Sequence, residues 1–160
     1  MLVEWPEAPL IMKTSLEIDA YPGNIHEWEA ARPGELASEE INALFGWKSA
    51  FHDSFGFYID GVDETTATLP PGWRDRAVVA DVQDGDVTLH AVAPRTVDVV
   101  VAKLHRLHDK DRGYIEACHF AHPLDLDLVW ERLLQCSPPR EIASAARAFL
   151  DGLSPTGDRA

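Results

Sequence analysis

The sequence predicts an α+β fold, in which strand-forming segments come first and helices follow. Two β-branched runs within residues 76–92 flank an Asp84-Gly85 turn signal and read as a hairpin. From Pro94 onward the apolar residues recur at helical spacing instead. Because strands and helices do not alternate, a doubly wound parallel sheet is not expected.

The first half of the chain contains two further predicted strands. Residues 16–21 form a short apolar run that stops at a Pro-Gly-Asn turn, and residues 55–62 form a second run that ends in a glycine turn. Between them, residues 25–47 are expected to be helical in parts, with Ser38 as an N-cap.

Four helices are predicted in the second half. The first spans about 97–107, the second runs from 109–111 to Pro123, the third covers about 124–134, and the fourth begins after Ser137. We therefore expect a single domain over 1–153, strand-rich in 1–93 and helical in 94–153, with a frayed tail at 154–160.

Composition indicates an ordinary globular protein, with 46% hydrophobic and 26% charged residues in 160. No apolar run reaches the length of a membrane span, and the first residues lack the layout of a signal peptide. Cys118 and Cys136 show no disulfide or zinc spacing, so free thiols are expected. These features together predict a cytoplasmic location and no membrane partner.

The charge is strongly negative and unevenly distributed. The formal net charge is -13, and residues 1–66 carry 13 acids and three bases, whereas residues 94–112 carry five bases and three acids. Bulk binding to nucleic acid is therefore not expected. An acidic strand and a basic helix are, however, what a magnesium–nucleotide complex requires.

Glu17 and Asp19 are the sequence's best candidates for a metal site. Residues two apart on a strand point to the same side, so both carboxylates should aim together. Mg²⁺ is a hard cation that takes one or two carboxylates together with phosphate oxygens. The alternative from these residues alone is an exposed face of an edge strand.

Several segments, taken in order, resemble an uncharacterised bacterial nucleotidyltransferase-like family. They are SLEIDAYP, SAFHDSFGFYIDGV, ATLPPGWRDR and VDVVVAKLHRLHDKD. The resemblance covers about residues 4–135. The family is related to the polymerase-beta-type transferases, including the toxin transferases of abortive-infection and toxin–antitoxin systems.

The resemblance implies a small mixed sheet with the carboxylate strand central, backed by helices and followed by a helical part. It also implies Mg²⁺-dependent transfer of a nucleoside monophosphate from an NTP to a hydroxyl of an unknown acceptor. Glu17 and Asp19 match the paired metal carboxylates, and Asp81 is the nearest candidate for a third.

The same resemblance implies nucleotide-binding residues at four further positions, which are Ser15, Lys103, Lys110 and Asp111. Lysines there could meet phosphate. The pair Lys110-Asp111 has an alternative role as a helix start, with Asp111 complementing the helix dipole.

Members of the family usually open with a Gly-Ser turn that cradles the NTP phosphates, and no such turn precedes Glu17. The alternative function is therefore a catalytically degenerate module that binds a nucleotide or a protein, and we expect weak catalysis or none. An open sheet edge could be covered by a second subunit, which would make a homo-oligomer.

Other residues could have either a functional or a purely structural role. Four histidines form two i,i+3 pairs that could bind zinc, or could complement helix ends; they are His105, His108, His119 and His122. His52 could act as a general base or could position its loop. Trp73 with Arg74 and Arg76 could hold a nucleotide, or Trp73 could anchor its turn to the core.

Overall fold

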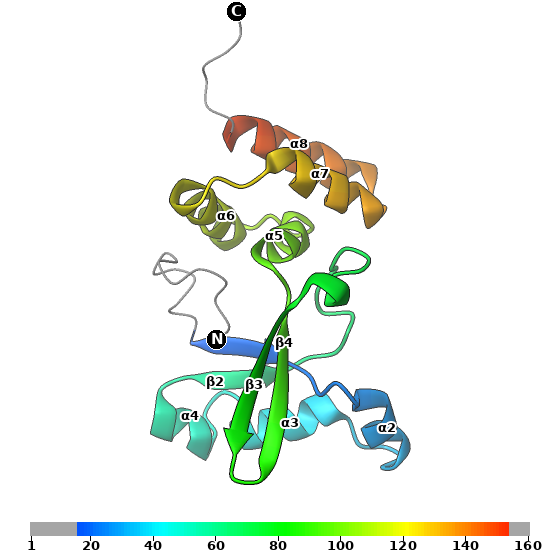
Figure 1. Ribbon diagram of the computed structural model, residues 1–160, viewed down its shortest axis with the longest axis vertical. Coiled ribbons are helices and arrows are strands. Elements are labelled where there is room, and N and C mark those ends of the chain that lie inside the picture. The colour runs from blue at the N-terminus through cyan, green and yellow to red at the C-terminus, as the bar shows by residue number, and fades with distance from the viewer. Residues whose placement is uncertain (1–15, 154–160) are drawn as a thin grey trace, which may run out of the picture. The chain divides into compact units, whose positions relative to one another are not determined.

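The computed structural model describes residues 16–153, with the side chains of all but residues 82, 84, 87 and 89. The predicted α+β architecture is confirmed, and the described chain divides into two compact units, 16–67 and 68–153 (Figure 1). The first unit holds β1 (Glu17–Ala20), α2 (Ile25–Ala30), α3 (Ala37–Phe45), α4 (Ala50–Phe55) and β2 (Tyr58–Gly61). The second holds the 3₁₀ turn η1 (Arg74–Arg76), β3 (Val78–Asp84), β4 (Val87–Ala93), α5 (Thr96–Leu104), α6 (Asp109–Ala121), α7 (Leu126–Gln135) and α8 (Arg140–Leu153). The expectation of one domain over 1–153 stays a prediction.

In the first unit, β1 and β2 are paired in parallel, in a register that runs from Glu17 opposite Tyr58 to Ala20 opposite Gly61. A parallel pair needs a crossover connection, and α2, α3 and α4 supply it. The expectation that strands and helices do not alternate is therefore wrong for this segment, although the α+β class is confirmed. Two of the three helices have only six residues, too few to display a helical period. Within the described residues, β1–β2 and β3–β4 form two separate two-stranded sheets, and a central position for the carboxylate strand in the small mixed sheet stays a prediction.

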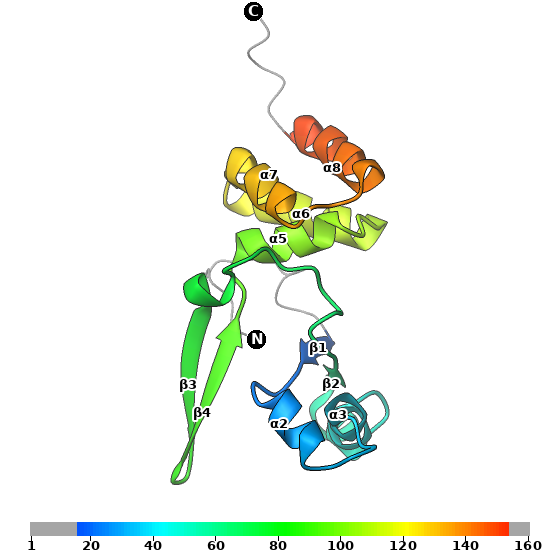
Figure 2. The ribbon, with the colours of Figure 1, turned by 90° about the vertical axis from the view of Figure 1, so that its right-hand side faces the viewer.

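Helix α3 lies directly against β2 (Figure 2). A Cβ on Gly61 would lie 2.8 Å from the Ser38 Cα and 2.9 Å from the Ile41 Cβ, so only glycine permits this approach. The Asn42 side chain then accepts a hydrogen bond from the Gly61 N–H at 2.7 Å. These contacts fix strand β2 to the helix, and Asp60, the residue before Gly61, is fixed with it.

The start of α3 differs from the prediction that Ser38 is its N-cap. The helix begins at Ala37, and the N-cap position is Leu36, whose side chain cannot accept a hydrogen bond. Glu29 from α2 takes that part instead, because its Oε1 accepts from the Ala37 N–H at 3.2 Å. A residue eight positions away therefore does what a local cap normally does.

The second unit combines the β3–β4 hairpin with four helices (Figure 1). The predicted hairpin is confirmed: Asp84 pairs with Val87, and Gly85 in the connecting loop has φ +60°. All four predicted helices are present within a few residues of the expected bounds. Their shared core is apolar and consists of Val100, Val101, Leu104, Leu107, Ile115, Cys118, Leu124, Val129, Leu133, Ala146 and Leu150.

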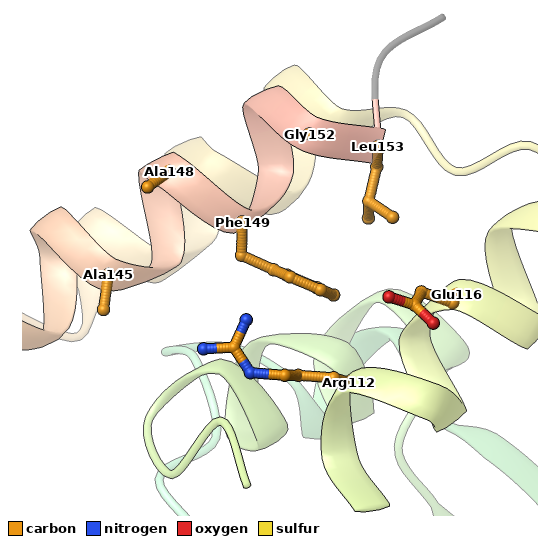
Figure 3. A pocket seen from close by; sticks show the side chains of 7 residues that line it. All are labelled: Arg112, Glu116, Ala145, Ala148, Phe149, Gly152 and Leu153. Atoms are coloured by element: carbon orange, nitrogen blue, oxygen red, sulfur yellow. The ribbon is translucent and has the colours of Figure 1, made fainter. Parts of the chain in front are cut away.

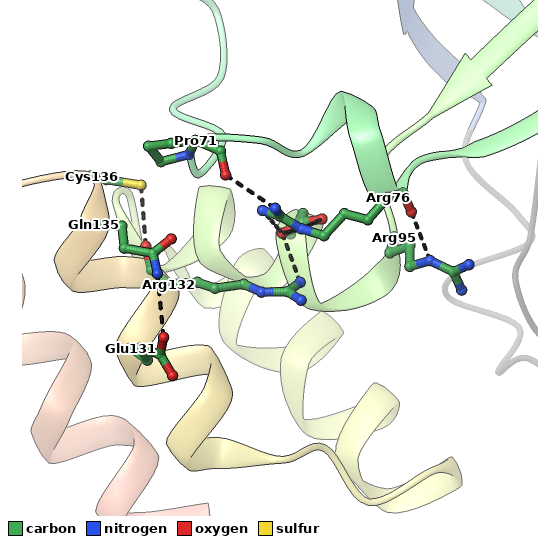
Figure 4. Close-up of polar contacts among 8 residues, drawn as sticks. Pro71, Arg76, Arg95, Glu131, Arg132, Gln135 and Cys136 are labelled. Atoms are coloured by element: carbon green, nitrogen blue, oxygen red, sulfur yellow. Dashed lines mark hydrogen bonds and ion pairs between the residues drawn. The ribbon is translucent and has the colours of Figure 1, made fainter.

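A buried charge cluster joins η1, α5 and α7. Asp98 has no exposed surface and accepts hydrogen bonds from Arg76 Nε at 3.0 Å and from Arg132 at 2.9 Å; both arginines are labelled in Figure 4. Arg76 Nη2 adds a third bond to Asp98 at 2.9 Å. A buried carboxylate is stable only when paired in this way. Arg76, a sequence candidate for holding phosphate, is therefore committed to the core of its own unit.

Within residues 16–153, no helix is both long enough and apolar enough to cross a bilayer.

Candidate functional site

Three carboxylates meet on the parallel strand pair of the first unit. Glu17 and Asp19 come from β1 and Asp60 from β2, and one oxygen of each lies within 4.8 Å of the others. The register explains the meeting, because Asp19 stands directly opposite Asp60. Asp19 is exposed, while Glu17 and Asp60 are half-buried. The expectation that Glu17 and Asp19 aim at one place agrees with this geometry.

Asp60 was missed from the sequence, which pointed to Asp81 as the third carboxylate. Asp81 lies on β3 of the other unit, is exposed, and forms an ion pair with His90 at 2.7 Å. The available signal for Asp60 was the segment Tyr-Ile-Asp-Gly, a second short strand that ends on an acid before a glycine. Only the parallel pairing shows that this acid stands beside Asp19.

Tyr58 is the direct partner of the first carboxylate. Its hydroxyl donates to Glu17 Oε2 at 2.7 Å, across the strand pair. This hydrogen bond, followed by burial and the negative charges of all three acids, raises the pKa of the Tyr58 phenol. The phenol is therefore protonated at neutral pH and acts as a donor that orients Glu17.

Tyr58 also belongs to an aromatic cluster with Trp47 and His52. The Trp47 ring lies 5.4 Å from the Tyr58 ring and 4.5 Å from the His52 ring, measured between centroids. His52 Nδ1 accepts from the Lys48 N–H at 3.1 Å, and the His52 N–H donates to the Ser49 hydroxyl at 3.2 Å. These contacts agree with the loop-positioning role of His52.

The sequence-predicted nucleotide-binding residues lie outside this unit or outside the described residues. Ser15 belongs to the latter. Lys103 donates to Asp111 at 3.1 Å and lies over the Tyr114 ring at 4.6 Å, whereas Lys110 is exposed on α6. Their role in binding a nucleotide stays a prediction.

Asp111 anchors the start of α6. It is buried, and it accepts from Lys103, from Arg106 at 3.3 Å and from the His108 N–H at 3.3 Å. Burial by itself raises the pKa of Asp111, but the hydrogen bond and charge of Lys103, followed by the charge of Arg106, outweigh it and lower the pKa. The geometry agrees with the alternative helix-start role of this residue.

The four histidines do not assemble a zinc site in the described part of the chain. Among the described residues, the side chains that could jointly bind a metal ion are those of Glu17, Asp19 and Asp60, and no such group contains a histidine. His105 Nδ1 lies 3.0 Å from the Val101 carbonyl, and His119 Nδ1 accepts from the Leu124 N–H at 3.0 Å. Each of these rings therefore makes a hydrogen bond to the backbone of its own or the following segment.

A groove between α6 and α8 also presents charged side chains (Figure 3). Arg112 and Glu116 face it from α6, and the Arg112 guanidinium lies over the Phe149 ring at 5.1 Å. Small residues of α8, namely Ala145, Ala148 and Gly152, form the opposite wall. With a single carboxylate, the groove lacks the donor set of a divalent metal site.

Comparison with known proteins identifies one family. The profile of a family described as "Nucleotidyltransferase of unknown function (DUF6036)" matches residues 11–144, which include all three carboxylates. No curated protein and no solved structure shows significant similarity to the chain.

Proposed function

This chain belongs to that nucleotidyltransferase family, and from this premise we propose that it transfers a nucleoside monophosphate from an NTP to a hydroxyl, using Mg²⁺ held by Glu17, Asp19 and Asp60. The convergence of the three carboxylates from two parallel strands is the observation that supports the proposal most. A degenerate, purely binding module is the competing function, and the experiments below separate the two.

The three side chains fit a hard divalent cation. All offered ligand atoms are carboxylate oxygens, the type that Mg²⁺ prefers, and three like charges within 4.8 Å of one another repel unless a cation or protons balance them. Part of the site is open to solvent through Asp19, which leaves room for water and phosphate oxygens around an ion. The set contains no sulfur or nitrogen ligand, which disfavours a zinc site.

The proposed reaction forms one bond and breaks one. The acceptor hydroxyl oxygen attacks the α-phosphorus of the NTP. The bond between the α-phosphorus and the oxygen that bridges the α- and β-phosphates breaks, and pyrophosphate leaves. Bound Mg²⁺ would neutralise the phosphate charge during this exchange. The carboxylates orient the reactants and accept the proton of the hydroxyl, while Tyr58 holds Glu17 in place through its 2.7 Å hydrogen bond.

Two assays test the proposal. Each NTP is added with MgCl₂ or with EDTA, and the melting temperature is measured; we expect stabilisation that requires Mg²⁺, since a ligand of the native state adds RT ln(1 + [L]/Kd) to the free energy of unfolding. Incubation with α-³²P-labelled NTPs and a cell extract then reports transfer of label. Asp19→Asn should abolish both signals, because it removes charge while keeping shape.

The outcomes separate the two functions. Mg²⁺-dependent stabilisation together with Asp19-dependent labelling supports the transferase. Stabilisation without labelling supports the binding module. If no NTP stabilises the wild-type protein, the transferase and a nucleotide-binding module are both refuted, and a protein-binding module is the function that is left.

A further inference from the structure

We propose that Trp47 forms the nucleobase subsite of this protein, by stacking the base of the nucleoside triphosphate whose phosphates meet the Glu17–Asp19–Asp60 group. The inference rests on the proposed function and extends it, because it assigns the part of the ligand that the carboxylates do not touch. Trp47 lies outside every motif that the sequence interpretation used for the site.

Trp47 is a large aromatic side chain that the fold leaves open to solvent. It is 58% exposed, although a tryptophan that only packs a loop is normally covered over most of its surface. One side of the indole is supported by the His52 ring at 4.5 Å and an interplanar angle of 33°. A supported and exposed aromatic ring is what the face of a nucleobase stacks on.

The loop is built to hold the ring in this position. Lys48, the next residue, has φ +64°, in the left-handed region that residues with a Cβ avoid. The Lys48 N–H donates to His52 Nδ1, and Ser49 caps α4 by accepting from the His52 N–H. Strained backbone conformations of this kind concentrate at binding sites, where the surrounding structure enforces them.

Tyr58 connects the indole ring to the carboxylates. The Tyr58 ring contacts the Trp47 ring at 5.4 Å between centroids, and its hydroxyl donates to Glu17 at 2.7 Å. Trp47 therefore belongs to the same local structure as the proposed phosphate end of the site. All of these residues belong to the first unit.

Charge favours a mononucleotide over a polynucleotide as the ligand. Residues 16–67 carry 11 acidic side chains and two cationic ones, Arg32 and Lys48. A phosphate backbone would be repelled over most of this unit, whereas an NTP brings its own magnesium. Lys48, one of these two cations, is exposed and follows Trp47 directly in the sequence.

The test compares an NTP with the same phosphate chain lacking a base. Calorimetry measures binding of Mg²⁺–ATP and of Mg²⁺–tripolyphosphate to the wild-type protein and to Trp47→Ala, Trp47→Phe and Phe55→Ala. We expect Trp47→Ala to weaken ATP binding about tenfold or more, since it removes one base–aromatic stack. Tripolyphosphate binding should stay unchanged. Trp47→Phe retains a ring and should remain close to wild type.

Phe55→Ala is the matched control, because Phe55 is a comparably exposed aromatic residue of the same unit whose ring contacts Phe51 and Phe57 instead of the Trp47 cluster. Binding of ATP by this variant should equal that of wild type. Quenching of tryptophan fluorescence by Mg²⁺–ATP gives a second readout, and Trp47→Phe should remove it.

The failures are distinguishable. If Asp19→Asn abolishes ATP binding while Trp47→Ala leaves it intact, the subsite is wrong and the proposed function stands. If Trp47→Ala weakens ATP and tripolyphosphate equally, the loop merely supports the carboxylates and the subsite is again wrong. If wild type binds neither ligand with Mg²⁺, the proposed function and the subsite both fail.

Discussion

Gly61 is the residue on which the geometry of the carboxylates most depends. It follows Asp60 on β2, and an added Cβ would collide with the Ser38 carbonyl oxygen and lie 2.8 Å from the Ser38 Cα. The obstacle is backbone, which cannot rotate out of the way as a side chain can. Gly61→Ala must therefore push α3 away from β2 and stretch the 2.7 Å hydrogen bond between the Gly61 N–H and Asn42.

The expected cost is that of overpacking a tight contact, about 1–3 kcal/mol in the free energy of unfolding. For a chain of this length, each kcal/mol corresponds to about 2–4 °C in the melting temperature. Urea unfolding followed by circular dichroism measures the loss. Because Asp60 moves with its neighbour, affinity for Mn²⁺, a paramagnetic substitute for Mg²⁺, should fall as well.

Gly23→Ala is the control. Nothing lies within 4 Å of a Cβ at Gly23, and its backbone is outside the left-handed region. We expect no loss there, and a gain of about 0.4–1 kcal/mol through the unfolded state. Equal unfolding midpoints for Gly61→Ala and wild type would refute the close packing of α3 on β2.

Three further predictions follow from other contacts. Tyr58→Phe removes the hydrogen bond to Glu17 and should weaken Mn²⁺ binding about 10–100-fold, measured by electron paramagnetic resonance, with little change in melting temperature. Asp98→Asn leaves two partly buried arginines without their counter-charge and should cost about 3–5 kcal/mol in urea unfolding; a loss below 1 kcal/mol would contradict the pairing with the buried Asp98 carboxylate. Because the pKa of Asp111 is lowered in the fold, its stabilisation is present above the unfolded pKa of about 4 and is lost as the pH falls through the folded value. The stability difference between wild type and Asp111→Asn should therefore shrink below about pH 4, and a constant difference would refute the assignment.

The helical second half was predictable from the sequence because its signals are local. Val97, Val100, Val101 and Leu104 recur at helical spacing, and these residues pack in or against the core that the four helices share. The hairpin was equally readable from Asp84 and Gly85, which supply turn chemistry between β-branched runs.

The carboxylate group was only half predictable. Glu17 and Asp19 share a face because of strand geometry, which is a local property. Asp60 joins them through a parallel pairing across 41 residues, from Asp19 to Asp60, and no local pattern encodes that register. For the same reason, the residues around Ser38 could not show that Glu29 accepts the hydrogen bond of the Ala37 N–H at the start of α3.

The most direct test of the account is whether Asp60 completes a metal site with Glu17 and Asp19. Mn²⁺ titrations followed by electron paramagnetic resonance, with and without ATP, should be compared among wild type, Asp60→Asn and Asp81→Asn. Asp81 is the matched control, an exposed strand aspartate of the other unit that pairs with His90. We expect Asp60→Asn to weaken Mn²⁺ binding by about tenfold or more and Asp81→Asn to bind as wild type does. Wild-type affinity in Asp60→Asn, or an equal loss in Asp81→Asn, would contradict this expectation.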